Sequence, residues 1–141
     1  MTEEIIKFDL GDVELLSGEK LTSAVLVAKT WGRLSAARDN VIVLPTYYTG
    51  THEGYAPLVG PGNVFDTNHY FVVSPNLFGN GLSTSPSNAI DSNSGPRFPQ
   101  VDVYDNVLCQ HRLLTERFDV TDIQLVAGWS MGAIQAFHWA V

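Results

Sequence analysis

The sequence predicts an α/β fold in which parallel strands are flanked by helices. Three short, continuous, β-branched runs are typical of strands buried on both faces of such a sheet. A stretch with helical periodicity lies between the last two runs, and strands that alternate with helices favour parallel pairing. A Gly-x-Ser-x-Gly sequence then joins the last run to an apolar helix start, which adds a strand–turn–helix unit to this pattern.

Length and composition are those of one folded unit. The chain has 141 residues, of which 45% are hydrophobic, with three Trp, five Tyr and seven Phe, so it can bury a core. Its formal net charge of −7 argues against nucleic-acid and anionic-membrane partners, which require clustered Lys and Arg. Cys109 is the sole cysteine, so an internal disulfide and a C-x-x-C site are both excluded.

No basic and apolar leader opens the sequence, and no apolar run reaches the ~18 residues of a membrane span. We therefore expect a cytoplasmic protein without a membrane partner. A targeting signal at the C-terminus cannot be assessed, because such a signal could lie in residues beyond position 141.

The N-terminal segment predicts antiparallel strands. Ile5–Leu10 and Val13–Leu16 alternate around Gly11–Asp12, which predicts one hairpin, and Ser17–Glu19 predicts a second that leads into Leu21–Thr30. Six acidic side chains here are expected on a solvated, exposed edge: Glu3, Glu4, Asp9, Asp12, Glu14 and Glu19.

The three apolar runs are Val41–Thr46, Tyr70–Ser74 and Ile123–Ala127. Each is short and β-branched, so each is expected to be buried. Pro75–Pro99 follows the second run and is rich in Gly, Ser, Asn and Pro without periodicity. A loop of this length is either functional or a disordered insert, and composition alone favours neither interpretation.

Helical periodicity extends over Val101–Val120. Val103, Val107, Leu114 and Phe118 share one stripe, with His111 at its edge and Cys109 off it. A second, apolar helix is expected over Ala133–Val141.

Gly128-Trp129-Ser130-Met131-Gly132 is the motif that carries chemistry. It follows a buried strand and opens a helix, which is the context of a nucleophile elbow with Ser130 as the nucleophile. The flanking glycines suit the crowding of such a turn. The alternative is an ordinary strand-to-helix turn in which Ser130 caps the helix.

A serine nucleophile needs a base to take its proton and donors for the developing oxyanion. One donor is expected from the N–H of Met131, the residue after the nucleophile. The second is expected from the loop Tyr47–Gly50, which follows the first apolar run. Pro45 has no N–H and cannot donate.

Several further segments resemble the homoserine O-acetyltransferase family of α/β-hydrolase-fold proteins. The order and spacing of these segments agree from about Ala24 to Val141, which is more specific than the elbow alone. The matching stretches are Thr30–Gly32, Thr49–His52, Asp66–Val73, Ser83–Ser87, Phe98–Pro99, Asp105–Val107 with Gln110, and Gly128–Trp139.

The resemblance implies an α/β-hydrolase fold and ping-pong acyl transfer through Ser130. Met131 and Tyr48 take the positions of the backbone oxyanion donors. The expected partners are a small-molecule acyl donor and an alcohol or water acceptor, with acyl-CoA as a candidate co-substrate and no bound cofactor. A homodimer is left open. The resemblance also favours an ordered, functional Pro75–Pro99 loop over a disordered insert.

Two departures add bulk beside the nucleophile. Transferases of the family usually carry Gly where this chain has Trp129, and His, a small residue and Leu where it has Thr46-Tyr47-Tyr48. These differences leave ester hydrolysis about as open as transfer to homoserine.

The triad acid and base of an α/β-hydrolase follow the nucleophile in the chain. After Ser130 the sequence contains no acidic residue and one histidine, His138. We therefore expect residues 1–141 to be the N-terminal part of a single α/β-hydrolase domain, a fragment that is inactive alone. The alternative is a non-catalytic remnant or an interaction-only protein.

The other histidines are assigned structural roles. His52 lies in the expected oxyanion loop but upstream of the nucleophile, His69 opens a strand and His111 edges a helix stripe. No pair has metal-ligand spacing with carboxylate support, so no metal is predicted. Gly79-Asn80-Gly81 lacks the third glycine of a dinucleotide-binding loop.

Overall fold

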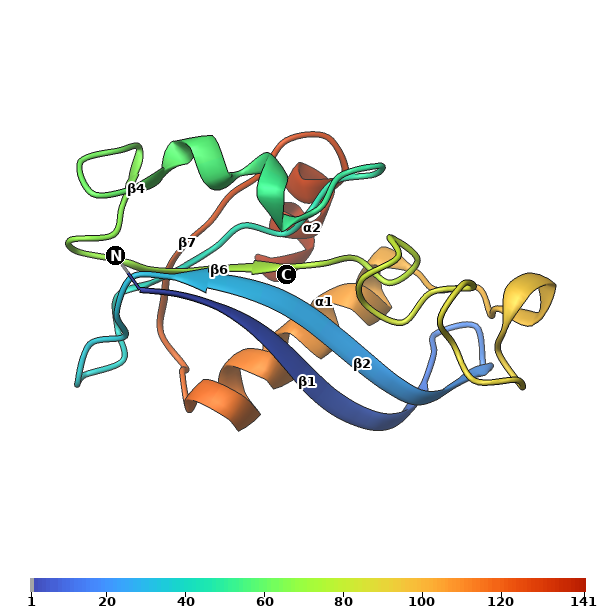
Figure 1. Cartoon of the computed structure of the whole chain (residues 1–141). Coiled ribbons are helices and arrows are strands. Elements are labelled where there is room, and N and C mark those ends of the chain that lie inside the picture. The colour runs from blue at the N-terminus through green and yellow to red at the C-terminus, as the bar shows by residue number, and fades with distance from the viewer. Residues whose placement is uncertain (1) are drawn as a thin grey trace.

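The computed structural model describes residues 2–141 and contains a twisted five-stranded sheet in the order β1-β2-β6-β3-β7 (Figure 1). Two short strands, β4 and β5, form a separate parallel pair. The strands are β1 (Glu3–Glu14), β2 (Lys20–Trp31), β3 (Val41–Val43), β4 (Val59–Gly60), β5 (Phe65–Asp66), β6 (Phe71–Pro75) and β7 (Ile123–Val126). The helices are α1 (Val103–Arg112) and α2 (Met131–Trp139), with 3-10 turns η1 (His52–Gly54), η2 (Ala56–Leu58) and η3 (Gly95–Arg97) and a π-helical turn η4 (Leu113–Arg117).

The sheet is mixed, as the sequence predicts. β1 and β2 pair antiparallel, and β2 pairs antiparallel with β6. β3 lies between β6 and β7 and is parallel to both. The chain therefore passes from an antiparallel start into a parallel region, and the carboxyl ends of β3 and β7 meet at one edge.

One predicted hairpin is wrong. β1 continues through Gly11 instead of turning back, and the register shifts on either side of this residue. Gly11 has φ 65°, and its N–H is bonded to the Asp9 carboxylate at 2.8 Å. Glycine at positive φ suits a bulge as well as a turn. The second predicted hairpin, at Ser17–Glu19, is confirmed by the antiparallel pairing of β1 with β2.

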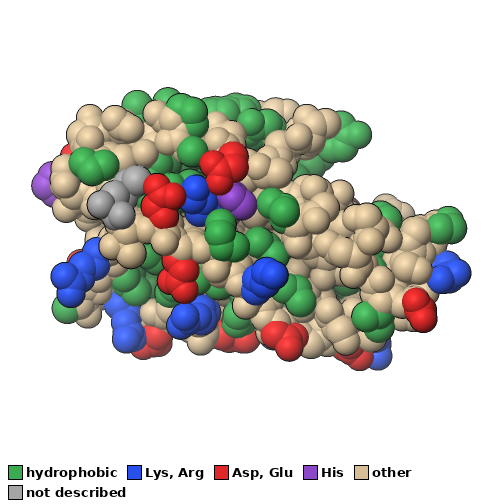
Figure 2. Space-filling view, viewed as in Figure 1, with side chains coloured by type: hydrophobic (Ala, Val, Ile, Leu, Met, Phe, Trp, Pro, Cys, Tyr) green, Lys and Arg blue, Asp and Glu red, His purple; other side chains and the backbone are tan. Residues whose placement is uncertain are grey.

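β1 forms the outer edge of the sheet, and its six acidic neighbours are exposed, as expected. Figure 2 shows acidic and basic side chains spread along this side of the molecule. Charges on an edge strand discourage pairing with another chain.

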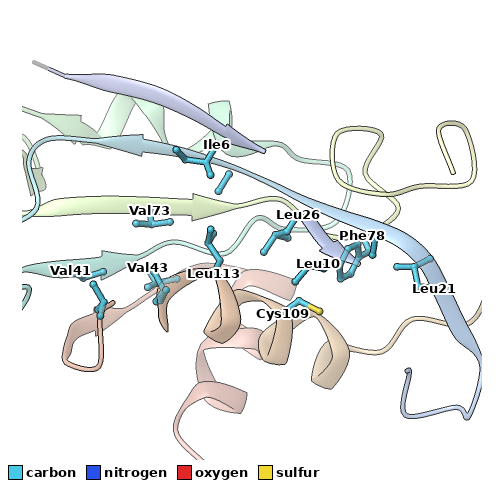
Figure 3. Close-up of a cluster of buried hydrophobic side chains, with 14 of the residues drawn as sticks. Ile6, Leu10, Leu21, Leu26, Val41, Val43, Val73, Phe78, Cys109 and Leu113 are labelled. Carbon is cyan, nitrogen blue, oxygen red and sulfur yellow. The ribbon is translucent and has the colours of Figure 1, made fainter. Parts of the chain in front are cut away.

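Each face of the sheet packs on a different part of the chain. On one face, Cys109 of α1 and Leu113 and Leu114 of η4 belong to a cluster that includes Leu26 and Val73 (Figure 3). On the other face, Tyr55 and Val59 pack against Trp31, Ile42 and Val72. β3 and β6 are thus buried on both sides, which explains their continuous apolar sequences.

The predicted helix over Val101–Val120 is shorter and less regular than the periodicity suggests. α1 begins after a capping box formed by Asp102 and Asp105, and η4 follows Arg112 as a π-helical turn. Cys109 was predicted to lie off the buried stripe but is 1% exposed. This prediction is wrong because the sheet covers a wider face of the helix than the four-residue stripe indicates.

The Pro75–Pro99 loop is ordered through buried polar side chains. The hydroxyls of Ser83 and Thr84 accept hydrogen bonds from the N–H groups of Val27 and Val25 at 2.9 and 2.7 Å. The loop thus takes the place of a strand along the part of β2 that β6 does not reach. The disordered-insert interpretation is wrong for this loop.

β7 departs from its predicted burial because it lies at the other edge of the sheet. Leu125 is 45% exposed, and the neighbouring α2 exposes Ile134 and Phe137 at 54% and 78%. Among residues 2–141, no helix is long and apolar enough to cross a membrane.

Candidate active site

Ser130 stands at the turn between β7 and α2. Its backbone has φ 53° and ψ −128°, a conformation that L-residues rarely adopt outside functional turns. Its carbonyl accepts from the N–H of Ala133 and Ile134, but its side chain forms no capping bond. The hydroxyl is therefore not used as a helix cap, and Ser130 is exposed.

The glycines of the motif are required by close packing. A Cβ at Gly128 would lie 2.8 Å from the Gly132 carbonyl carbon, and one at Gly132 would lie 2.7 Å from the Pro45 carbonyl oxygen. Either Cβ would also lie within 2.9 Å of the Tyr55 hydroxyl oxygen. The end of β3, Tyr55 and the start of α2 are thus in direct contact across these two positions.

The Tyr55 side chain packs against both glycines of the elbow. Its ring is 1% exposed, and its hydroxyl donates to the Pro45 carbonyl at 2.8 Å. Burial raises the pKa of Tyr55 to about 12, while a backbone hydrogen bond with Trp129 acts in the opposite direction. Tyr55 is therefore a protonated structural donor at neutral pH.

Trp129 and Tyr47, which both depart from the transferase pattern, pack against each other. The Trp129 ring lies 5.5 Å from that of Tyr47 and 4.7 Å from that of Tyr55, measured between centroids. Gly50 and Gly54 leave the space that the Tyr47 side chain fills, since a Cβ at Gly50 would overlap its ring and a Cβ at Gly54 would overlap its hydroxyl oxygen. The large residue before the nucleophile is thus matched by a large residue in the loop.

A cavity of about 480 Å³ lies beside the elbow. Both residues predicted as backbone oxyanion donors, Tyr48 and Met131, line it. Within residues 2–141, neither of their N–H groups donates a hydrogen bond to another protein group. The lining contains no charged side chain and consists of Tyr47, Tyr48, Thr49, Leu77, Phe78, Gly79, Asn80, Val101, Val103, Asn106 and Met131.

His52 is buried in a network that ties the Tyr47–Gly50 loop to the segment after β6. Asn76 Oδ1 accepts from the His52 N–H at 3.1 Å, so its Nδ2 faces His52 Nδ1 at 2.9 Å. His52 Nδ1 must therefore accept, and Nε2–H donates to Glu53 Oε1 at 3.1 Å. Burial lowers the pKa of His52, so the ring is neutral and has a structural role.

This network predicts a pH dependence of stability. The folded pKa of His52 lies below the ordinary value of 6.5, so the unfolded chain binds a proton more readily. The free energy of unfolding should therefore fall as the pH decreases from 6.5 toward the folded pKa. Urea titrations at pH 7.5 and 5.5 measure this change. His52→Asn keeps an acceptor near Asn76 but cannot titrate, so its loss over the same interval should be smaller.

The remaining histidines occupy surface or packing positions. His138 packs edge to face against Tyr104 with ring centroids 5.5 Å apart, and the ring centroids of His111 and Trp139 are 6.0 Å apart. His69 approaches the Asp66 carboxylate at 3.9 Å. Among residues 2–141, no three His, Cys, Asp or Glu side chains are grouped so that they could hold a metal ion.

Sequence reasoning missed the polar side chains that hold the loops together. Gln110 and Gln135 are 1% and 0% exposed, and Asn76 is 0% exposed. Gln135 lies in an otherwise apolar helix, where a single buried amide is a signal that periodicity does not interpret.

No family model matches the chain. An ethyl acetate hydrolase of Pseudomonas veronii is 39% identical over 134 residues, which cover 94% of this chain and 38% of that protein. A homoserine O-acetyltransferase of Methanohalophilus mahii is 32% identical over 143 residues, covering 90% of this chain and 29% of that protein. The crystal structure of the acetyl esterase MekB superposes with a TM-score of 0.92 at 38% identity, covering 99% of this chain and 40% of that structure.

This chain has an α/β-hydrolase fold. Its homologues are esterases and homoserine O-acetyltransferases. The chain spans about two fifths or less of the length of these relatives. The α/β-hydrolase likeness identified from the sequence is thereby confirmed.

Proposed function

We propose that residues 1–141 form the N-terminal part of a single α/β-hydrolase domain and supply the nucleophile of a serine-dependent ester hydrolase. Ser130 attacks the carbonyl carbon of the acyl group, and the N–H groups of Met131 and Tyr48 stabilise the oxyanion. A base takes the proton of the serine hydroxyl and gives it to the leaving oxygen as the ester C–O bond breaks, so that the alcohol departs. Water then attacks the acyl-serine, which releases the carboxylic acid and restores the serine hydroxyl. The single observation that carries this proposal is the backbone of Ser130, held at φ 53° without a capping bond.

A neutral ester is the substrate class that fits the described part of the site. The cavity beside Met131 and Tyr48 has no cationic side chain for the phosphates of an acyl-CoA. It likewise offers no charge to pair with the carboxylate or ammonium group of an amino acid acceptor. The alternative reaction is transfer of the acyl group from acyl-CoA to an alcohol. It is supported by the 32% identity to the Methanohalophilus mahii transferase.

The base and acid come from a segment outside residues 1–141. The Ser130 hydroxyl has no hydrogen-bond partner among residues 2–141, and the ring of His52 is engaged with Asn76 and Glu53. Tyr48 and Trp129 are 73% and 44% exposed beside it. Oxyanion stabilisation is strongest where water is excluded, so a covering segment would also complete the site electrostatically.

An interaction-only role is the second candidate. It is favoured by the unpaired edge of β7 and by the exposed side chains of Ile134 and Phe137 on α2. An uncovered strand edge beside an apolar helix face is a surface on which another polypeptide can pack.

A hybrid protein tests the proposed function. Residues 1–141 are joined to the part of the Pseudomonas veronii ethyl acetate hydrolase that follows its aligned region; we refer to this protein as the hybrid hydrolase. A fluorophosphonate probe should label the hybrid hydrolase, and the protein should hydrolyse ethyl acetate. Ser130→Ala should abolish both signals. The 141-residue chain alone should remain unlabelled, because no base activates its serine.

Two results would count against the proposal. A hybrid hydrolase that folds, as judged by its circular dichroism and cooperative unfolding, but is not labelled would reject Ser130 as a nucleophile. Rapid labelling of the 141-residue chain that Ser130→Ala abolishes would show that the base lies within these residues.

A further inference from the structure

A buried chain of side-chain amides connects α1, α2 and the loop after β3. Trp139 Nε1 donates to Gln110 Oε1 at 3.0 Å, and Gln110 Nε2 donates to Gln135 Oε1 at 2.7 Å. Gln135 Nε2 then donates to the Thr46 carbonyl at 2.8 Å and to the Met131 carbonyl at 3.1 Å. Gln135 is 0% exposed, so water cannot replace these bonds.

The direction of this chain is determined at both ends. An indole N–H can only donate, which makes Gln110 present its oxygen to Trp139. The carbonyls of Thr46 and Met131 can only accept, which makes Gln135 present its nitrogen to both of them. The Gln110–Gln135 contact is consistent with both conditions, so neither amide can be rotated by 180° without losing hydrogen bonds.

The two carbonyls belong to the two segments that carry the proposed oxyanion donors. Met131 follows the nucleophile, and Thr46 precedes Tyr48 by two residues in the loop. One nitrogen, through its two hydrogens, therefore links these segments directly. Thr46 is also bonded to the end of β6 and to the segment after it, through its N–H to the Pro75 carbonyl at 3.1 Å and through its Oγ1, which accepts from the Leu77 N–H at 3.0 Å.

We propose that Gln135 is a positioning residue that sets the separation between the Met131 and Tyr48 N–H groups. This inference rests on the proposed function. Gln135 does not touch the substrate; it holds the two donors at the spacing that the oxyanion requires. Oxyanion donors act only when they lie within hydrogen-bond distance of one oxygen, so a small displacement of the loop reduces the rate.

Gln135→Met is the test variant, because methionine has a similar shape and lacks the two donated hydrogens. Gln110→Met is the matched control, since it removes a bond of the same buried network but leaves Gln135 Nε2 on both carbonyls. In the hybrid hydrolase, Gln135→Met should lower kcat and kcat/KM together by about 10- to 100-fold with little change in KM. Gln110→Met should change each by less than about threefold while reducing stability.

Amide hydrogen exchange in the 141-residue chain gives a second readout that needs no activity. Gln135→Met should accelerate exchange at Thr46 and Gly50, whose N–H groups donate to the carbonyls of Pro75 and Tyr47 at 3.1 and 3.0 Å. It should also shift the Tyr48 amide resonance, whereas Gln110→Met should leave these amides near their parent values. If Gln135→Met does not fold, Gln135→Glu replaces it. Its protonated carboxyl keeps the shape and one donor. The protection factors at Thr46 and Gly50, which are corrected for the general rise of amide exchange with pH, should therefore fall as the pH rises and this group ionises.

The outcomes separate this inference from the proposed function. Equal kcat values and equal exchange at Thr46 and Gly50 in the Gln135 and Gln110 variants would reject the positioning role while leaving Ser130 as the nucleophile. An inactive but folded parent hybrid would reject the proposed function, and the exchange data would then decide alone whether Gln135 orders the loop.

Discussion

Replacing Ser130 by glycine should abolish ester turnover in the hybrid hydrolase and at the same time stabilise the protein. The hydroxyl is the proposed nucleophile, and loss of such a group lowers kcat by about 10⁴-fold or more. The backbone at φ 53° and ψ −128° is unfavourable for serine and accessible to glycine. Relief of this strain should raise the free energy of unfolding by about 1 kcal/mol. Ester hydrolysis and urea unfolding measure the two effects.

Ser130→Ala is the matched control for this double effect. It removes the hydroxyl but retains a Cβ at positive φ, so it should abolish turnover without the gain in stability. A glycine variant that is no more stable than the alanine variant would show that the elbow is not strained. Retention of activity in either variant would contradict the assignment of the nucleophile.

Replacing Gly132 by alanine should destabilise the protein by about 3 kcal/mol, even though alanine is the better helix former by about 1 kcal/mol. The reason is the position of the new Cβ, 2.7 Å from both the Pro45 carbonyl oxygen and the Tyr55 hydroxyl oxygen. The β3 end and α2 would have to separate, which would also displace the Tyr48 loop. Urea unfolding of the 141-residue chain and turnover by the hybrid hydrolase report the two consequences.

A double-mutant cycle with Tyr55→Phe identifies the clash. Removing the hydroxyl eliminates one of the two contacts, so Gly132→Ala should cost less in the Tyr55→Phe background than in the parent. Additive costs would mean that the Tyr55 hydroxyl does not limit the space at Gly132. A stabilising Gly132→Ala would contradict the close packing altogether.

Much of the fold could be predicted because its signals are local. Val41–Val43 and Phe71–Val73 are apolar throughout, and burial on both sides of a sheet is the environment that suits such runs. The wrongly predicted hairpin arose because one glycine is compatible with two backbone geometries. Gly11 at positive φ is compatible with a turn and with a bulge, and only the long partner strand β2 decides that β1 continues.

The residues proposed to carry the chemistry of the site were predicted from the sequence, but the residues that hold them in place were not. Ser130, Met131 and Tyr48 follow from a short motif and its resemblance to a family. Tyr55 and Gln135 could not be assigned, because their partners lie 10 and 89 positions away in the sequence and no local pattern connects them. Trp129 and Tyr47 were each recognised from the sequence as larger than the residues that transferases of the family carry there. The structure explains both residues together, because their ring centroids are 5.5 Å apart and the two side chains pack against each other.

The sequence by itself determined the order of the main sheet strands and helices and the elbow motif, since these depend on neighbouring residues and on periodicity. Its resemblance to the homoserine O-acetyltransferase family indicated the hydrolase fold. Only the tertiary structure decided how the elbow and the Tyr48 loop meet. It also decided that Gln135 joins these two segments and that Gly132 must lack a side chain there. The physical reason is that hydrogen bonds and close contacts between segments depend on distances that the folded sheet imposes.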